Sequence, residues 1–103
     1  MAWTLAATMA DFAGRDLVGV ECRSQRIAVY RIGESFFATS DTCPHHGASL
    51  SRGCIVGGLI ECPAHFALFD IRTGAAEGGP TSRPVKAFAT KVEQDGVYVD
   101  LDA

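Results

Sequence analysis

The sequence predicts an all-β protein, built as a small antiparallel β-sandwich or barrel. Short runs rich in β-branched and aromatic residues recur along the chain, and turn-forming residues separate them every several positions. No window of the sequence shows a sustained apolar period of about 3.6 residues, so long helices are not expected. Several short strands at this spacing are typical of antiparallel sheets packed around a core.

The N-terminal part predicts a strand, a helical turn and three further strands. We interpret residues 1–7 as the first strand and its turn, while residues 8–13 could form only a helical turn or two. Residues 17–22 are the next β-rich run. Residues 26–32 alternate, which is typical of a strand with two different faces. A glycine-containing turn then leads into residues 36–39 and predicts a hairpin.

The remaining strands are shorter and lie around glycine turns. Four are expected, over residues 54–56, 59–61, 88–93 and 97–101. Gly57-Gly58 joins the first two as a tight hairpin, because glycine accepts the positive φ of such turns. Asp95-Gly96 joins the last two. Residues 76–84 are rich in glycine and proline, and we interpret them as a loop.

Length and charge narrow the classes of function. At 103 residues the chain is expected to form a single domain, residues 1–103, with one modest core. Its 9 basic and 12 acidic residues give a net charge of −3, which argues against a nucleic-acid partner. No stretch approaches the roughly 20 apolar residues of a membrane span. The N-terminus lacks the positively charged start of a signal peptide, so we expect a cytoplasmic protein with no membrane contact.

Cysteine and histidine side chains are concentrated in one stretch. Three of the four cysteines and all three histidines lie within residues 43–65. In a reducing compartment, metal binding or burial explains such thiols better than two disulfides do. Cys22 and Cys54 lie in apolar strand runs, and we expect both to be buried thiols without a further role.

The decisive pattern is Cys43-Pro44-His45, then sixteen residues, then Cys62-Pro63-Ala64-His65. Each segment offers one thiolate and one imidazole, and the hairpin between them would bring the two segments side by side. A Cys₂His₂ set can bind zinc, but structural zinc sites usually have a wider spacing in one ligand pair and a helix that carries the histidines. A binuclear iron–sulfur cluster, with thiolates on one iron and imidazoles on the other, fits this spacing better.

At these residues the sequence resembles the Rieske family, whose motif is C-x-H followed, after a spacer of about this length, by C-x-x-H. Residues 43–50 and 62–70, with Thr73-Gly74 after them, resemble the two cluster loops of that family, and the likeness covers essentially the whole chain. The resemblance implies a Rieske fold, in which two loops form a cluster-binding subdomain over about residues 41–80. It also implies one [2Fe–2S] cluster as the cofactor.

The resemblance also assigns the ligands. Cys43 and Cys62 would bind the inner iron, and His45 and His65 would bind the outer iron near the surface. The spacing from Cys43 to His46 mirrors the spacing from Cys62 to His65. The family places the first imidazole ligand at His45, however, so we expect His46 to be an exposed neighbour of the site.

Four positions depart from the high-potential members of the family. Those members carry a disulfide between the two loops, at positions that match Ala48 and Ala64, and alanines cannot form it. They also place a serine and a tyrosine hydroxyl beside the cluster, at positions that match Ala67 and Phe69. Because hydrogen bonds to cluster sulfur stabilise the reduced state, their absence predicts a potential near the low end of the Rieske range, roughly −150 mV.

A small, low-potential member of this family resembles the ferredoxin component of bacterial aromatic-ring-hydroxylating dioxygenase systems. The resemblance implies a monomeric one-electron carrier, and not an enzyme. It would take electrons from an NADH-dependent flavoprotein reductase and pass them to a terminal Rieske oxygenase that hydroxylates aromatic compounds. His46 alone could not complete the mononuclear iron site of two histidines and a carboxylate that an oxygenase needs. Four residues are expected at the docking rim: Arg52, Phe66, Pro80 and Thr81.

Two alternatives stay open at this point. One is a small Rieske-type subunit of a nitrite reductase-like enzyme, although members of that group can lack cluster ligands, and all four are present here. The other is a zinc-stabilised interaction module with no redox role. Iron content separates the zinc module from the other two, and a reductase-dependent electron-transfer assay separates the carrier from the enzyme subunit.

Overall fold

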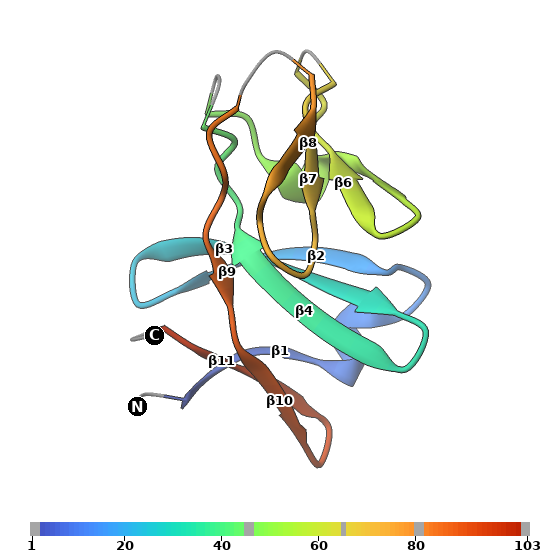
Figure 1. The fold of residues 1–103 in the computed structure, drawn as a ribbon. Helices are drawn as coiled ribbons and strands as arrows, with labels where there is room; N and C mark the ends of the chain where they lie inside the picture. The colour runs from blue at the N-terminus through green and yellow to red at the C-terminus, as the bar shows by residue number, and fades with distance from the viewer. Residues whose placement is uncertain (1–2, 45–46, 65, 80–81, 102–103) are drawn as a thin grey trace.

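The computed structural model describes residues 3–44, 47–64, 66–79 and 82–101. Within these residues the chain forms eleven strands and two short 3₁₀-helices, and the strands pair in antiparallel fashion. Figure 1 shows the strands in three sheets, placed one above another in this view. The predicted antiparallel all-β class is therefore confirmed.

The first sheet pairs the two ends of the described chain. Its order is β1-β11-β10, with β1 at Trp3–Thr8, β10 at Thr90–Glu93 and β11 at Gly96–Asp100. β10 and β11 form the expected final hairpin, with Val92 opposite Val97. A 3₁₀-helix, η1 at Met9–Phe12, follows β1 where the sequence predicts a helical turn.

The second sheet is the centre of the molecule. Its order is β2-β3-β4-β9, with β2 at Leu17–Cys22, β3 at Gln25–Ile32, β4 at Ser35–Ser40 and β9 at Ala87–Phe88. β3 is buried on both faces, because alternate side chains of a strand point to opposite sides. Ile27 and Val29 enter one core, while Ala28 and Tyr30 enter another. The alternation over residues 26–32 therefore separates two cores.

The third sheet is formed by residues that lie between and after the two segments of the predicted site. Its order is β5-β6-β7-β8, with β5 at Cys54–Val56, β6 at Leu59–Glu61, β7 at Leu68–Asp70 and β8 at Ala76–Gly78. β5 and β6 form the predicted two-residue hairpin, in which Gly57 has a φ of +63°. The second 3₁₀-helix, η2 at Leu50–Arg52, leads into β5.

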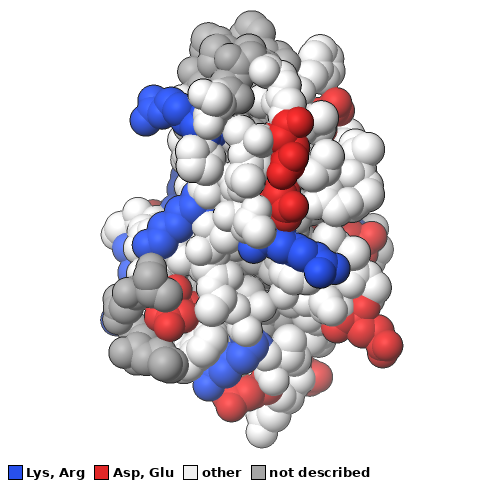
Figure 2. Space-filling model, viewed as in Figure 1, with Lys and Arg blue, Asp and Glu red and all other residues white. Residues whose placement is uncertain are grey.

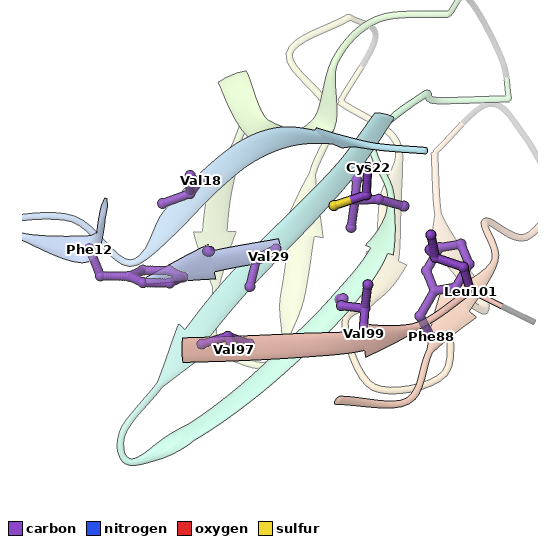
Figure 3. Close-up of a cluster of buried hydrophobic side chains, with 11 residues drawn as sticks. Phe12, Val18, Cys22, Val29, Phe88, Val97, Val99 and Leu101 are labelled. Carbon is purple, nitrogen blue, oxygen red and sulfur yellow. The ribbon is translucent and has the colours of Figure 1, made fainter. Parts of the chain in front are cut away.

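The apolar core has two parts. The first is shared by the first two sheets, and Figure 3 shows Val29 of β3 and Val97 and Val99 of β11 among its side chains. The second part joins β3 to the third sheet, and it includes Cys43 and Cys62. The cysteines of the predicted site thus lie in apolar surroundings.

Three expectations of detail are wrong. Residues 88–93 do not form one strand, because the chain crosses between sheets at Ala89: β9 belongs to the second sheet and β10 to the first. Part of the expected loop over residues 76–84 is strand β8, which pairs with β7. Cys54 is exposed, not buried, because it lies on the short edge strand β5, where Cys54 and Val56 both face solvent.

Candidate metal centre

Two loops carry the cysteines of the predicted site. The first cluster loop, residues 43–48, comes after β4, and the second cluster loop, residues 62–67, follows β6 directly. Figure 1 shows the described residues of both loops toward the end of the molecule farthest from β1 and β11. The hairpin of β5 and β6 lies between them in the sequence and returns the chain to this end, as the sequence predicts.

The two cluster loops share one backbone construction. The Cys43 N–H donates to the Ala48 carbonyl at 2.8 Å, and the Cys62 N–H donates to the Ala67 carbonyl at 2.8 Å. The fourth residue after each cysteine has a positive φ, +73° at Gly47 and +58° in the second loop. Each loop therefore folds back on its own start, and a backbone hydrogen bond fixes each cysteine.

The structure brings the two predicted cysteine ligands together. Cys43 and Cys62 are buried, with exposed fractions of 1% and 0%, and neither forms a disulfide. Burial raises the pKa of the Cys62 thiol, a backbone hydrogen bond from Ala64 lowers this pKa, and a hydrogen bond with the Cys43 side chain raises it. The Cys43 and Cys62 side chains are thus neighbours within one buried apolar cluster. Two soft thiolate ligands at such a place could bind the same metal ion.

The predicted imidazole ligands, His45 and His65, lie outside the described residues, as do His46, Pro80 and Thr81. Among the residues that are described, no group of three His, Cys, Asp or Glu side chains could hold a metal ion. The described part of the predicted ligand set is therefore the two cysteines. Thiolates are the protein ligands of iron–sulfur clusters, and this pair is adjacent, buried and without a disulfide, as one iron of a [2Fe–2S] cluster requires.

The side chains around the two cysteines are apolar. Ala67 and Phe69 are fully buried in the same core as the cysteines, and Ala48 and Ala64 pack against it. None of these four side chains carries a thiol or hydroxyl, so none could form a disulfide or donate a hydrogen bond to a cluster sulfur. The two predicted rim residues within the described chain are both exposed: Arg52 and Phe66.

A buried carboxylate that the sequence reading missed lies two residues before Cys43. Asp41 accepts hydrogen bonds from the Ser51 N–H at 2.6 Å, from the Ser51 hydroxyl at 3.1 Å and from Arg26 at 3.1 Å. Its backbone carbonyl accepts the Leu50 N–H at 2.7 Å. These bonds tie the start of the first cluster loop to η2, just beyond the end of that loop. The only signal in the sequence is an acidic residue beside the cysteine motif, and such residues are usually solvated.

The second cluster loop is held by close backbone packing. A Cβ atom at Gly79, whose φ is +92°, would lie 2.6 Å from the Cα atom of Ala67.

A second close backbone contact lies beyond the second cluster loop. A Cβ atom at Gly74, whose φ is +81°, would collide with the Val85 carbonyl oxygen. The Val85 N–H donates to the Gly74 carbonyl at 2.9 Å. Only glycine satisfies both the positive φ and the close approach at these two positions.

The sequence profile of one family, described as the Rieske [2Fe-2S] domain, matches residues 2–89. The chain belongs to the Rieske [2Fe–2S] family. Its cofactor is a Rieske-type [2Fe–2S] cluster, and the adjacent thiols of the two cluster loops fit this cofactor. This assignment favours iron over the zinc-stabilised module that the sequence alone left open.

Relatives of this Rieske protein include ferredoxins of dioxygenase systems. The chain is 38% identical to the ferredoxin component of biphenyl 2,3-dioxygenase from Rhodococcus jostii (strain RHA1) over 102 residues, which cover 99% of this chain and 95% of that relative. The ferredoxin of carbazole 1,9a-dioxygenase from Nocardioides aromaticivorans IC177 superposes with a TM-score of 0.88 at 30% identity, covering 96% of this chain and 97% of that one. The expected Rieske fold is thereby confirmed.

A further solved structure contains a partner protein. It is a complex of reduced oxygenase and oxidized ferredoxin in carbazole 1,9a-dioxygenase, and its matching chain is 37% identical, with a TM-score of 0.85. The match covers 94% of this chain and 91% of that one. In the part of this Rieske protein that the structure describes, no helix has the length and apolar character needed to cross a bilayer.

Proposed function

We propose that this Rieske protein is a one-electron carrier and not itself an enzyme. It takes electrons from an NADH-dependent flavoprotein reductase and passes them to a terminal Rieske oxygenase that hydroxylates aromatic compounds. The observation that carries the proposal is the pair of buried, adjacent thiols of Cys43 and Cys62 in a chain that matches dioxygenase ferredoxin components over nearly its whole length. Carriers of this kind meet their partners briefly, through interfaces below roughly 1,200 Å².

The proposed ligands are Cys43 and Cys62 on the inner iron and His45 and His65 on the outer iron. The bound cluster supplies the one-electron chemistry. The chain itself fixes the two thiolates by backbone hydrogen bonds and keeps water from them with the apolar side chains of the second core. Because reorganisation of water opposes electron transfer to a charged centre, a dry and rigid surround suits a carrier.

The proposed carrier function also leads to assignments of the domain bounds, the oligomeric state, the cellular location and the reduction potential. We assign residues 1–103 to one Rieske domain, with a cluster-binding subdomain over about residues 41–80, the stretch that includes both cluster loops and the third sheet. A monomer in the cytoplasm accords with a carrier that shuttles between two partners. The fully buried Ala67 and Phe69 bring no hydroxyl to the site, and this supports a potential near the low end of the Rieske range.

Electron paramagnetic resonance during a stepwise reductive titration tests the cofactor and its potential. We expect a rhombic signal whose average g value lies below the free-electron value, and which appears only at low potential. A signal at clearly positive potential would overturn the low-potential assignment. Protein isolated without air that contains zinc and no iron would overturn the carrier function altogether. Transfer of electrons from a flavoprotein reductase to a terminal oxygenase then separates the carrier from a nitrite reductase-like subunit.

A matched pair of histidine variants tests the ligand assignment. His65→Ala should abolish the normal Rieske signal, because one iron loses an imidazole ligand. His46→Ala should leave the signal unchanged, since His46 is assigned as a neighbour and not a ligand. Loss of the signal in His46→Ala with a retained signal in His45→Ala would show that the first imidazole ligand had been placed on the wrong residue.

A further inference from the structure

Phe66 combines two unfavourable features in the second cluster loop. The residue is 66% exposed, the highest value among the exposed large hydrophobic residues of the described chain. Its φ of +58° lies in the left-handed region, which bulky L-residues rarely adopt. Glycine would remove both features, and the equivalent position of the first cluster loop is indeed Gly47, with a φ of +73°.

The surrounding contacts fix this conformation. The hydrogen bond from the Cys62 N–H to the Ala67 carbonyl closes the loop around Phe66. Ala67 is fully buried, and Gly79 packs so closely that a Cβ atom there would lie 3.2 Å from the Phe66 carbonyl oxygen. The ring therefore stays outside while the next residue enters the core. Strain that the surroundings enforce in this way is typical of functional positions.

The position of Phe66 suits contact with a redox partner. It directly follows His65, the proposed ligand of the outer iron, so a protein that touches the ring also approaches the side of the cluster from which an electron would leave. On the face shown in Figure 2, uncharged side chains lie beside both basic and acidic ones toward this end of the molecule. An exposed aromatic ring is well suited to bury itself in a partner.

We propose that Phe66 is the apolar anchor by which this carrier docks on the terminal oxygenase, inserting its ring into an apolar recess of that protein. The inference rests on the proposed carrier function. The oxygenase is the chosen occupant because a solved relative of this chain, at 37% identity and a TM-score of 0.85, is a ferredoxin in complex with its oxygenase. One aromatic anchor gives a small, short-lived interface much of its affinity without a large area.

Three variants separate the ring from the strain. Phe66→Gly removes the ring and relieves the backbone, whereas Phe66→Ala removes the ring and keeps the strain. Phe66→Tyr keeps the aromatic ring and serves as the matched control. The holoproteins are reduced with dithionite, so that the reductase step is bypassed. Their reoxidation is then followed against rising concentrations of the oxidised oxygenase components of the biphenyl 2,3-dioxygenase and carbazole 1,9a-dioxygenase systems.

The half-saturating oxygenase concentration should rise about tenfold in both Phe66→Gly and Phe66→Ala and stay near the wild-type value in Phe66→Tyr. The resonance signal and the potential should not change in any of the three. Phe66→Gly should melt at a higher temperature than Phe66→Ala, because glycine accepts the positive φ. A purely structural role would move the melting temperature and not the half-saturating concentration.

Several results would overturn the anchor. One is an unchanged half-saturating concentration in the Gly and Ala variants, and another is loss of the cluster signal in both. A tenfold effect on reduction by the flavoprotein reductase alone would make the reductase the occupant and the oxygenase assignment wrong. If the wild-type protein reduces neither oxygenase, the carrier function itself fails. If the wild-type protein reduces an oxygenase and the Gly and Ala variants do so equally well, only the proposed role of Phe66 fails, and the carrier function stands.

Discussion

The two cluster loops present their cysteines in the same way but are held by different means. In both, the cysteine N–H donates to the carbonyl of the fifth residue after it. The first loop is then fixed by a polar network, in which the buried Asp41 carboxylate accepts two hydrogen bonds from Ser51 and one from Arg26. The second loop is fixed by contact between backbones, where Gly79 lies against Ala67.

This difference shows that one local geometry can have two physical origins. A polar network depends on charge and on complete hydrogen bonding, so it is sensitive to substitutions that keep volume but change charge. Close backbone packing leaves no room for a single methyl group and is indifferent to charge. The first cluster loop should therefore respond to the loss of a carboxylate, and the second to added volume.

The largest effect is expected from added volume behind the second loop. Gly79→Ala forces a Cβ atom to within 2.6 Å of the Ala67 Cα atom at a φ of +92°, and should lower the free energy of unfolding by about 3 kcal/mol. Gly57→Ala is the control, because Gly57 has a φ of +63° with open space around it, and should cost only about 1 kcal/mol. Urea unfolding of the holoproteins measures both. Equal costs would mean that the backbone contact does not hold the loop.

Loss of charge behind the first loop should have the next largest effect. Asp41→Ala leaves the partly buried Ser51 N–H without its charged acceptor, and should lower the free energy of unfolding by about 2 kcal/mol. Arg26→Ala tests the ion pair separately. Because the Arg26 side chain is 57% exposed, its loss should cost only about 0.5 kcal/mol. Similar costs for both variants would assign the effect to the ion pair instead of the bonds to Ser51.

The strands and the motif could be predicted because each depends on short stretches of sequence. The alternation of residues 26–32 and the glycine turn within residues 54–61 are local signals, and the structure places β3, β5 and β6 there. The ligand motif is equally local, and the adjacency of Cys43 and Cys62 follows from the single hairpin between them.

The missed features depend on contacts between distant parts of the chain. The break at Ala89 arises because β9 and β10 belong to different sheets, which no local pattern records. Asp41 is buried only because Ser51 and Arg26 approach it from η2 and β3. Cys54 resembles a buried strand residue in the sequence, but β5 is the edge of its sheet. The sequence gives the elements, and tertiary pairing decides which of their faces meet solvent.

Alkaline pH should destabilise the protein through Tyr30, a buried residue whose pKa is influenced by the Asp41 carboxylate behind the first cluster loop. Tyr30 is buried in the second core and shares a 2.7 Å hydrogen bond with Thr39. Burial raises the pKa of Tyr30, the bond with Thr39 lowers this pKa, and the charge of Asp41 raises it. The folded protein thus holds the phenol proton more tightly than the unfolded chain does. Its contribution to stability is complete below the unfolded pKa of about 10 and declines as the pH rises from there toward the folded pKa.

The variant Tyr30→Phe lacks this proton. The wild-type protein should lose about 1.4 kcal/mol of stability per pH unit above pH 10 through Tyr30, in addition to any decline that both proteins share. The difference in unfolding free energy between the two proteins should therefore shrink as the pH rises. Urea titrations at several pH values between neutrality and 11 measure it, and a constant difference would contradict the assignment.

The smallest expected effect is a change in the reduction potential of the cluster when a hydroxyl is added to one loop or to the other. Ala67 and Ala48 occupy equivalent positions, since the carbonyl of each accepts the N–H of its own cysteine. Ala67 is fully buried, and by resemblance it matches the position of a serine hydroxyl in high-potential Rieske proteins. Ala67→Ser should therefore donate a hydrogen bond to the cluster and raise the potential by about 40 mV, which corresponds to about 1 kcal/mol. Ala48→Ser, which adds a hydroxyl in the first loop, should leave the potential within about 10 mV of the wild-type value, because the hydroxyls that high-potential members place beside the cluster match Ala67 and Phe69 and not Ala48. Redox titration followed by paramagnetic resonance measures both shifts. Equal shifts would mean that any added hydroxyl near the cysteines tunes the cluster, and that the low potential does not depend on the second loop in particular.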